Sequence, residues 1–127
     1  MKNVYSLGAY QINRDDFVLD ILYENGKVYV SYSEDRGDGK SSTSIASARF
    51  DYKGLNFKTI FRAEPSINSG YHFGSRLVIK GDHLYASVGE RGGGMIAQDP
   101  SKHPGSIIRI NLDGTVPLDT PHFLEKK

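Results

Sequence analysis

Two side chains in the middle of the sequence could carry out acid–base chemistry. His72 lies in the stretch YHFGSRL (residues 71–77), between two aromatic residues and close to a glycine. A neutral imidazole accepts a proton near neutral pH, which makes His72 a candidate general base. Glu90 ends the stretch YASVGE, and a carboxylate beside an imidazole can orient the ring and stabilise its protonated form. The residues alone leave two interpretations open: a catalytic pair, or a packed corner histidine and an ordinary loop carboxylate.

A predicted β-hairpin would bring these two side chains to one place. Segments 75–81 and 83–89 are short apolar and β-branched runs separated by turn residues at Gly81-Asp82. If the two segments pair, the loop before the first strand and the loop after the second leave the same edge of the sheet. His72 lies in the former loop and Glu90 in the latter.

The same strand signals recur along most of the chain. Asn25-Gly26 predicts a tight hairpin turn, because a type I′ turn needs positive φ at both central positions. No segment of about a dozen residues has a convincing 3.6-residue period, so we expect almost no helix. The segments expected to be strands are 17–23, 27–33, 44–52, 57–63, 75–81, 83–89 and 105–112.

Short strands at even spacing are typical of a sandwich, a barrel or propeller blades. Four strands precede residue 65 and three or four follow it, and units of about 45 to 50 residues match the size of propeller blades. We therefore predict an all-β chain of four-stranded antiparallel meanders, as about two β-propeller blades. The expected divisions are a first blade at about 17–65, a second at about 72–117 and an exposed tail at 118–127.

Two loops are expected to interrupt the meanders. The polar segment 34–44 is predicted to be a flexible loop. The segment 90–105 is long for a connection between strands, and long loops more often carry functional residues than short ones.

The other histidines give little support for a metal site. None forms an H-x-x-x-H or H-E-x-x-H pair, so zinc is not indicated. We expect His83 and His122 to be surface residues. His103 lies in the long loop, from which it could approach His72.

The polar loop itself offers two weaker signals. Asp35 and Asp38 could bind calcium through carboxylate oxygens, but they lack the spacing of an EF-hand, and we expect a charged turn and no metal site. The stretch GDGKSS (residues 37–42) resembles a phosphate-binding loop only in part, because Glu34 stands where that pattern requires glycine.

Bulk composition excludes some classes of partner. The 127 residues allow one small domain, and 16 basic against 15 acidic residues give no electrostatic argument for nucleic acid or an anionic membrane. The absence of cysteine excludes disulfides. The apolar runs are far too short to span a bilayer, and the first ten residues lack the apolar core of a signal peptide. We expect a chain that is cytoplasmic as written, or one whose leader is not included.

The ordered motifs from residue 71 to residue 117 resemble a known family, the soluble quinoprotein sugar dehydrogenases, which comprise aldose sugar and glucose/sorbosone dehydrogenases. The motifs that carry the resemblance are YHFGSRL, GERG, AQD, IIRI and DGTVP. Upstream, VLDILYENGKVYVSYSE and FKTIFRAEP are similar to the family's preceding blade, so the resemblance covers residues 18–123.

The resemblance implies a six-bladed β-propeller that carries pyrroloquinoline quinone (PQQ) and calcium. The histidine at the position of His72 would remove the proton of an aldose's anomeric hydroxyl while hydride passes to the quinone, with Glu90 assisting. Asp15 falls where the family has a glutamine or glutamate that lines the substrate site, and Tyr71 and Arg91 are further candidates for substrate binding. The cofactor-binding residues cannot be assigned, and the family is typically periplasmic.

Members of this family are roughly three times as long as this chain, and their later blades supply most of the cofactor site. Two blades leave sheet faces uncovered, so we expect a homo-oligomer, such as a trimer that completes a six-bladed ring, or a fragment that associates less regularly. Three functions stay open: a PQQ-dependent oxidoreductase or its catalytic part, a non-catalytic module that binds sugar or protein or self-assembles, and a purely structural fragment.

Overall fold

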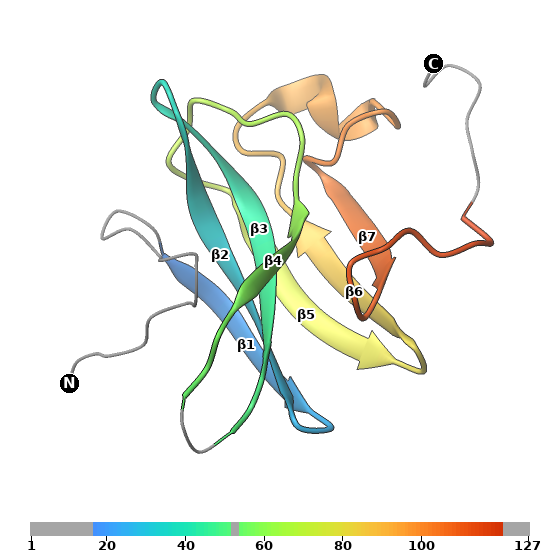
Figure 1. The fold of residues 1–127 in the computed structure, drawn as a ribbon. Helices are drawn as coiled ribbons and strands as arrows, with labels where there is room; N and C mark the ends of the chain where they lie inside the picture. Colours follow the sequence, from blue (N-terminus) through green and yellow to red (C-terminus); the bar gives the residue numbers. More distant parts are fainter. Residues whose placement is uncertain (1–16, 52–53, 121–127) are drawn as a thin grey trace.

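The described part of the chain folds into two antiparallel β-sheets (Figure 1). The computed structural model describes residues 17–51 and 54–120. The first sheet has the strand order β1-β2-β3-β4 and the second β5-β6-β7, so each is a simple meander and the all-β prediction is confirmed. The strands are β1 (Val18–Glu24), β2 (Lys27–Gly37), β3 (Lys40–Arg49), β4 (Lys58–Arg62), β5 (Gly74–Lys80), β6 (His83–Val88) and β7 (Ser106–Asn111).

The predicted tight turn joins β1 to β2. Glu24 pairs with Lys27, and the two residues between them, Asn25 and Gly26, have φ of 55° and 79°. Both values belong to the left-handed region that asparagine and glycine tolerate best, which explains the hairpin signal in the sequence. The hairpin of β5 and β6 also forms as predicted, with Lys80 opposite His83.

The prediction of a flexible loop at 34–44 is wrong. Strands β2 and β3 continue through this segment and leave only a two-residue turn at Asp38-Gly39. Some of the polar side chains that suggested a loop are buried in the sheet instead, whereas Asp35, Asp38 and Lys40 are exposed near its turn. Glu34 is buried, and its carboxylate accepts hydrogen bonds from Ser44 Oγ at 2.6 Å and Arg62 Nε at 2.9 Å. Polar residues form a buried strand when every group finds a partner.

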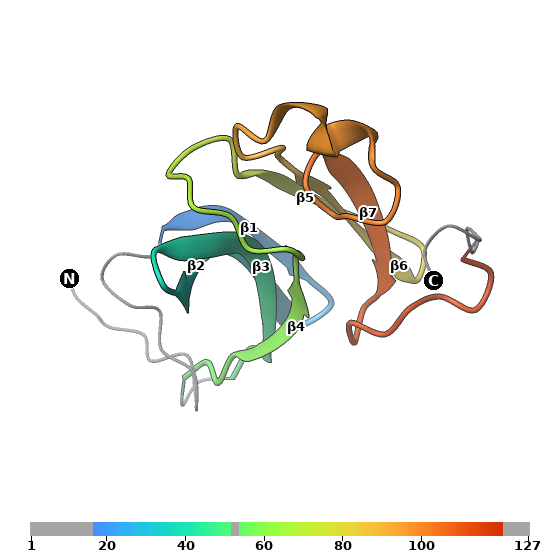
Figure 2. The ribbon, with the colours of Figure 1, turned by 90° about the horizontal axis from the view of Figure 1, so that it is seen from above.

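The two sheets share a hydrophobic core, and the first sheet carries a second, separate buried cluster of Val30, Tyr32, Ala46, Ala48 and Phe57. In the view from above, they lie side by side and splay apart (Figure 2). At their junction the Leu77 amide donates to Asp20 Oδ2 at 2.8 Å, which ties β5 to β1. The buried members of the shared core are Tyr29, Ile45, Ala63, Leu77, Leu84, Ala86, Val88, Ile108 and Ile110.

The faces that point away from this shared core still expose apolar side chains. On β1, Leu22 packs against the core, so its neighbours Ile21 and Tyr23 face the other way, and both are more than half exposed. On β7, Ile107 is 76% exposed, whereas Ile108 and Ile110 of the same strand belong to the core. Both sheets therefore carry apolar surface on their outward sides.

Within residues 17–51 and 54–120 there is one short helical turn, a 3₁₀-helix at Gly94–Gln98, in the segment between β6 and β7. Among the described residues, no helix is long and apolar enough to cross a membrane.

Candidate functional site

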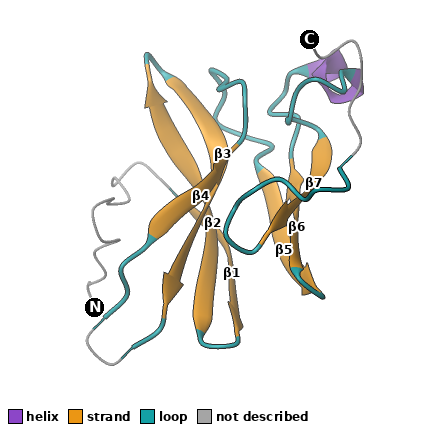
Figure 3. Ribbon diagram, turned by 45° about the vertical axis from the view of Figure 1, so that its right-hand side comes forward, coloured by secondary structure: helices purple, strands orange, loops and turns teal. Residues whose placement is uncertain are grey.

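The loops that precede β5 and follow β6 meet at one end of the second sheet. Gly74, the first residue of β5, pairs with Val88, the last residue of β6, so the chain on either side of this pair lies at the same sheet edge. Figure 3 shows these loops together with the 3₁₀-helix at that end of the molecule. The hairpin therefore places His72 and Glu90 side by side, as predicted from the expected pairing of segments 75–81 and 83–89.

His72 and Glu90 form a direct contact, with 2.5 Å between His72 Nδ1 and Glu90 Oε1. The same carboxylate oxygen accepts the backbone N–H of Gly92 at 3.1 Å. The hydrogen bond from Gly92, followed by the interactions with His72, lowers the pKa of Glu90 below its ordinary value. Glu90 is thus an ionised acceptor, and the ring nitrogen that faces it, Nδ1, is the one that carries the proton.

The rest of the imidazole is open. The His72 side chain is 56% exposed, and with Nδ1 donating to Glu90, the neutral ring presents Nε2 as a proton acceptor. The Tyr71 ring meets the His72 ring edge-on at 4.3 Å between centroids, and Tyr71 is itself more than half exposed. An exposed aromatic ring beside an available base could contact a ligand.

The backbone around His72 is held in an uncommon conformation. His72 has φ of 60°, and Ser75, shortly after it, has φ of 85°. Such values are unfavourable for residues with a side chain, and they persist only where neighbouring structure enforces them. The end of β6 does so, because the Gly89 amide donates to Phe73 O at 2.9 Å and the Arg91 amide donates to His72 O at 3.2 Å.

Arg91, which the sequence placed among the substrate-binding candidates, is almost fully buried, with 2% of its surface exposed. Burial lowers the pKa of its guanidinium group. Its nitrogens donate to Tyr71 O at 3.1 Å, Ser41 O at 2.8 Å and Ser41 Oγ at 2.7 Å, and also to Ser69 O. This enclosure does not favour direct contact with a sugar, and the predicted contact stays untested.

The remaining predicted site residues lie elsewhere. Asp15 is outside the described residues. His103 does not join the pair, because its Nδ1 accepts the Glu64 amide at 2.9 Å and its ring packs 5.1 Å from that of Phe61. Within residues 17–51 and 54–120, no group of three or more His, Cys, Asp and Glu residues is placed to hold a metal ion.

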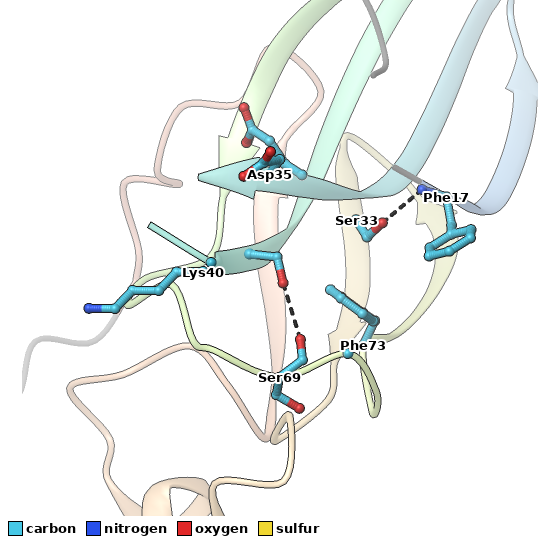
Figure 4. Close-up of a pocket in the computed structure, with 10 residues that line it drawn as sticks. Phe17, Ser33, Asp35, Lys40, Ser69 and Phe73 are labelled. Carbon is cyan, nitrogen blue, oxygen red and sulfur yellow. Dashed lines mark hydrogen bonds between the residues drawn. The ribbon is translucent and has the colours of Figure 1, made fainter. Parts of the chain in front are cut away.

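A pocket of about 260 Å³ lies beside the His72 loop, and no sequence pattern predicted it. Figure 4 shows Ser69 and Phe73, from the loop before β5, facing the end of the β2–β3 hairpin, with Phe17 beside Ser33 and the Lys40 side chain pointing outward. They combine two aromatic rings with polar groups: Phe17, Ser33, Asp35, Lys40, Ser69 and Phe73. Pocket residues Gly70 and Phe73 flank Tyr71 and His72 in the chain, which places the pocket next to the candidate base.

Comparison with known protein families matches residues 15–127 to the model described as glucose/sorbosone dehydrogenase. The chain belongs to this family. The resemblance read from the motifs between residues 71 and 117 is therefore confirmed at the level of the family.

Two relatives extend the comparison. Aldose sugar dehydrogenase YliI of Escherichia coli is 35% identical over 106 residues, which are 80% of this chain and 29% of the relative. The uncharacterized protein slr1608 of Synechocystis is 37% identical over 110 residues, which are 77% of this chain and 26% of the relative. The chain thus spans little more than a quarter of the length of these relatives.

Solved structures support the same relationship. A crystal structure of glucose dehydrogenase superposes with a TM-score of 0.77 at 29% identity, covering 92% of this chain and 34% of that one. The apo-form of the soluble aldose sugar dehydrogenase of Escherichia coli gives a TM-score of 0.76 at 31% identity, covering 91% of this chain and 36% of that one. The two sheets therefore match a portion of propeller glucose dehydrogenase structures.

Proposed function

We propose that this chain provides the general base of an enzyme that oxidises aldose sugars, with His72 as the base and Glu90 as its partner. The observation that carries the proposal is the contact of 2.5 Å between His72 Nδ1 and Glu90 Oε1. It orders one tautomer of a largely exposed imidazole and leaves the opposite nitrogen free to take a proton.

The chemistry assigned to these residues is proton abstraction. His72 Nε2 accepts the proton of the anomeric hydroxyl, and the positive charge that develops on the ring is stabilised by the carboxylate of Glu90. The exposed ring of Tyr71 and the adjacent pocket provide an aromatic surface and polar groups on the side of the loop where a sugar would lie. Oxidation also requires a hydride acceptor.

PQQ would supply that acceptor when bound, since the resemblance implies a quinone that takes up hydride. The described residues do not by themselves fit this anionic cofactor. Arg91, the buried cation beside the site, directs its donors to backbone and serine oxygens, and the same part of the chain offers no cluster of metal ligands for calcium. We therefore derive no step through PQQ and assign only the base to this chain.

The relatives support the substrate class. The Escherichia coli relative is named as an aldose sugar dehydrogenase and two of the structural neighbours as glucose dehydrogenases. An aldose is thus the proposed substrate. Because the chain spans only part of these proteins, the substrate class and the oxidation of an aldose belong to the proposal, in which this chain contributes the base.

Dye-linked oxidation of glucose, with PQQ and calcium added, tests the proposal. His72→Ala should lower the rate by about 10²- to 10⁴-fold, the usual contribution of a general base. His83→Ala is a matched control, because His83 lies at the opposite end of β6 and should leave the rate unchanged. A His72→Ala variant that retains the wild-type rate would refute the proposal.

A second candidate function is a module that binds sugar without oxidising it. The pocket favours this alternative, because it combines aromatic and polar groups without needing a cofactor. Glucose binding measured by calorimetry, with no oxidation in the presence of PQQ and calcium, would support this alternative over the enzyme.

The predicted homo-oligomer, for example a trimer, also remains a proposal. The apolar side chains on the outward sides of both sheets support it, because Ile21 and Tyr23 on one side and Ile107 on the other are exposed. A head-to-tail contact between copies would cover both surfaces. Size-exclusion chromatography with light scattering should give a mass above one chain, and a stable monomer would exclude the assembly.

A further inference from the structure

We propose that Arg91 is a positioning residue, which fixes the loop of His72 against the first sheet and so determines where the base stands relative to the pocket. The inference rests on the proposed function in one respect, because it takes His72 to be the base. It assigns Arg91 a role other than substrate contact.

The hydrogen bonds of Arg91 join segments that are far apart in the sequence. Its guanidinium donates to the backbone oxygen and hydroxyl of Ser41, at the start of β3 in the first sheet. It also donates to Tyr71 O and Ser69 O in the loop that leads into the second sheet. A planar group with five donors in a fixed arrangement suits such a set of acceptors, and a lysine ammonium does not reproduce it.

The environment of Arg91 is unusual for a buried charge. Among the described residues, no carboxylate forms an ion pair with it, so its partners are neutral oxygens and the face of the Phe73 ring, 3.7 Å from the guanidinium carbon. Removing an arginine from water without an opposite charge is costly, although hydrogen bonds and the aromatic face offset part of that cost. An apolar residue would fill the same space at lower cost, which points to the directed hydrogen bonds as the reason for arginine.

Arg91 and its neighbour Glu90 hold the same loop in complementary ways. Glu90 binds the imidazole of His72, whereas Arg91 binds the backbone on its N-terminal side, and the Arg91 amide also donates to His72 O. Arg91 and His72 both have φ of 60°, so neither backbone is in its most stable region. The strain is tolerated because contacts on both sides determine the loop.

The same contacts reach the pocket. Ser41, Ser69 and Phe73 line the pocket, and each is also in contact with the Arg91 side chain. The guanidinium therefore links the pocket wall to the base. A substitution of Arg91 should therefore move the pocket wall relative to His72, even if Glu90 is intact.

Ring nitrogen spectroscopy tests this inference without relying on activity. Long-range ¹H–¹⁵N spectra of the full chain report how much neutral His72 carries its proton on Nδ1 and how much on Nε2. In the wild type, the contact with Glu90 should make the Nδ1–H form dominant. Arg91→Lys should lower the ratio of Nδ1–H to Nε2–H about tenfold, the effect of losing roughly one charge-assisted hydrogen bond.

Two further variants make the experiment decisive. Arg49→Lys is the matched control, because Arg49 is exposed at the far end of β3. In this variant the ratio of Nδ1–H to Nε2–H in His72 should equal that of the wild type. Ser41→Ala removes one acceptor of Arg91 and should shift the ratio in the same direction by a smaller factor. If Arg91→Lys does not fold, the test rests on Ser41→Ala. An unchanged His72 tautomer ratio in Ser41→Ala then overturns the inference.

The outcomes separate this inference from the proposed function. A folded Arg91→Lys variant with a lower melting temperature and an unchanged His72 ratio shows a merely structural role and overturns the inference. A shifted ratio supports it even if His72→Ala leaves glucose oxidation unaffected, in which case only the proposed function fails. An unchanged ratio together with a loss of oxidation in His72→Ala removes the positioning role and keeps the base.

Discussion

Replacing Gly89 by alanine should disrupt the candidate site through backbone sterics alone. A Cβ at this position would lie 1.8 Å from His72 O, 2.5 Å from His72 C and 2.9 Å from Phe73 C. All three contacts are with backbone, so no flexible side chain can move aside. Separations below 3.0 Å essentially never occur for a real Cβ, so the His72 loop would have to move by about 1 Å or more.

The size of the effect follows from what that movement breaks. The hydrogen bonds from the Gly89 amide to Phe73 O and from the Arg91 amide to His72 O are both lost or weakened. Each contributes about 1 kcal/mol net, and overpacking costs about 1–3 kcal/mol more. Gly89→Ala should therefore lower the free energy of unfolding by about 4 kcal/mol, which for a chain of this size lowers the melting temperature by about 15 °C.

Gly70→Ala is the matched control for this prediction. Gly70 lies in the same loop, but a Cβ there meets nothing within 4 Å, and its φ is outside the left-handed region. Thermal unfolding followed by circular dichroism should show Gly70→Ala within about 1 kcal/mol of the wild type or slightly more stable. A Gly89→Ala chain that unfolds at the wild-type temperature would refute the reasoning, because it would mean that the close approach to His72 does not exist.

Three other perturbations test contacts elsewhere. Asp20→Asn weakens the acceptor of the Leu77 amide between the sheets and should lower the free energy of unfolding, measured in urea, by about 1 kcal/mol. An unchanged urea midpoint would contradict this hydrogen bond between the sheets. Glu34→Gln removes the buried charge that binds Arg62 and should cost about 2 kcal/mol by the same assay, whereas a stabilised variant would show that the pair is not favourable. Hydrogen bonds, first that from Gly92, lower the folded-state pKa of Glu90. The ionised carboxylate therefore stabilises the fold above its unfolded-state pKa of about 4.3. That stabilisation is lost as the pH falls through the folded-state pKa. The melting temperatures of Glu90→Gln and wild type should differ at pH 7 and approach each other as the pH falls below the folded-state pKa of Glu90, and a difference that does not change with pH would argue against the contact.

Much of the fold could be predicted because its signals are local. Alternation in β1 and β2 and the residues of their turn act over a few positions, and the structure forms that hairpin in the expected register. The contact of His72 with Glu90 was also within reach, because a single hairpin separates them and the pairing of its strands determines where both loops emerge. Their catalytic role stays a prediction.

The segment at 34–44 shows why composition misleads. Polar residues favour loops when water satisfies their polar groups, but here the buried carboxylate of Glu34 finds its partners on neighbouring strands. Glu34 is bound by Arg62, which lies 28 residues away on β4. Sequence alone does not reveal such a partner, since nothing near Glu34 in the chain indicates it.

By itself, the sequence determined the strand pattern outside residues 34–44, the tight turn at Asn25-Gly26, the order of the family motifs and the identity of the candidate base, because each depends on neighbouring residues or on one hairpin. Tertiary structure decided the roles of Arg91 and the pocket. Arg91 reads in the sequence as a polar loop residue available to a sugar, yet its acceptors lie up to 50 positions earlier, at Ser41. Only the packing of one sheet beside the other brings those oxygens together, and that packing encloses the charge which the sequence alone would have placed in solvent.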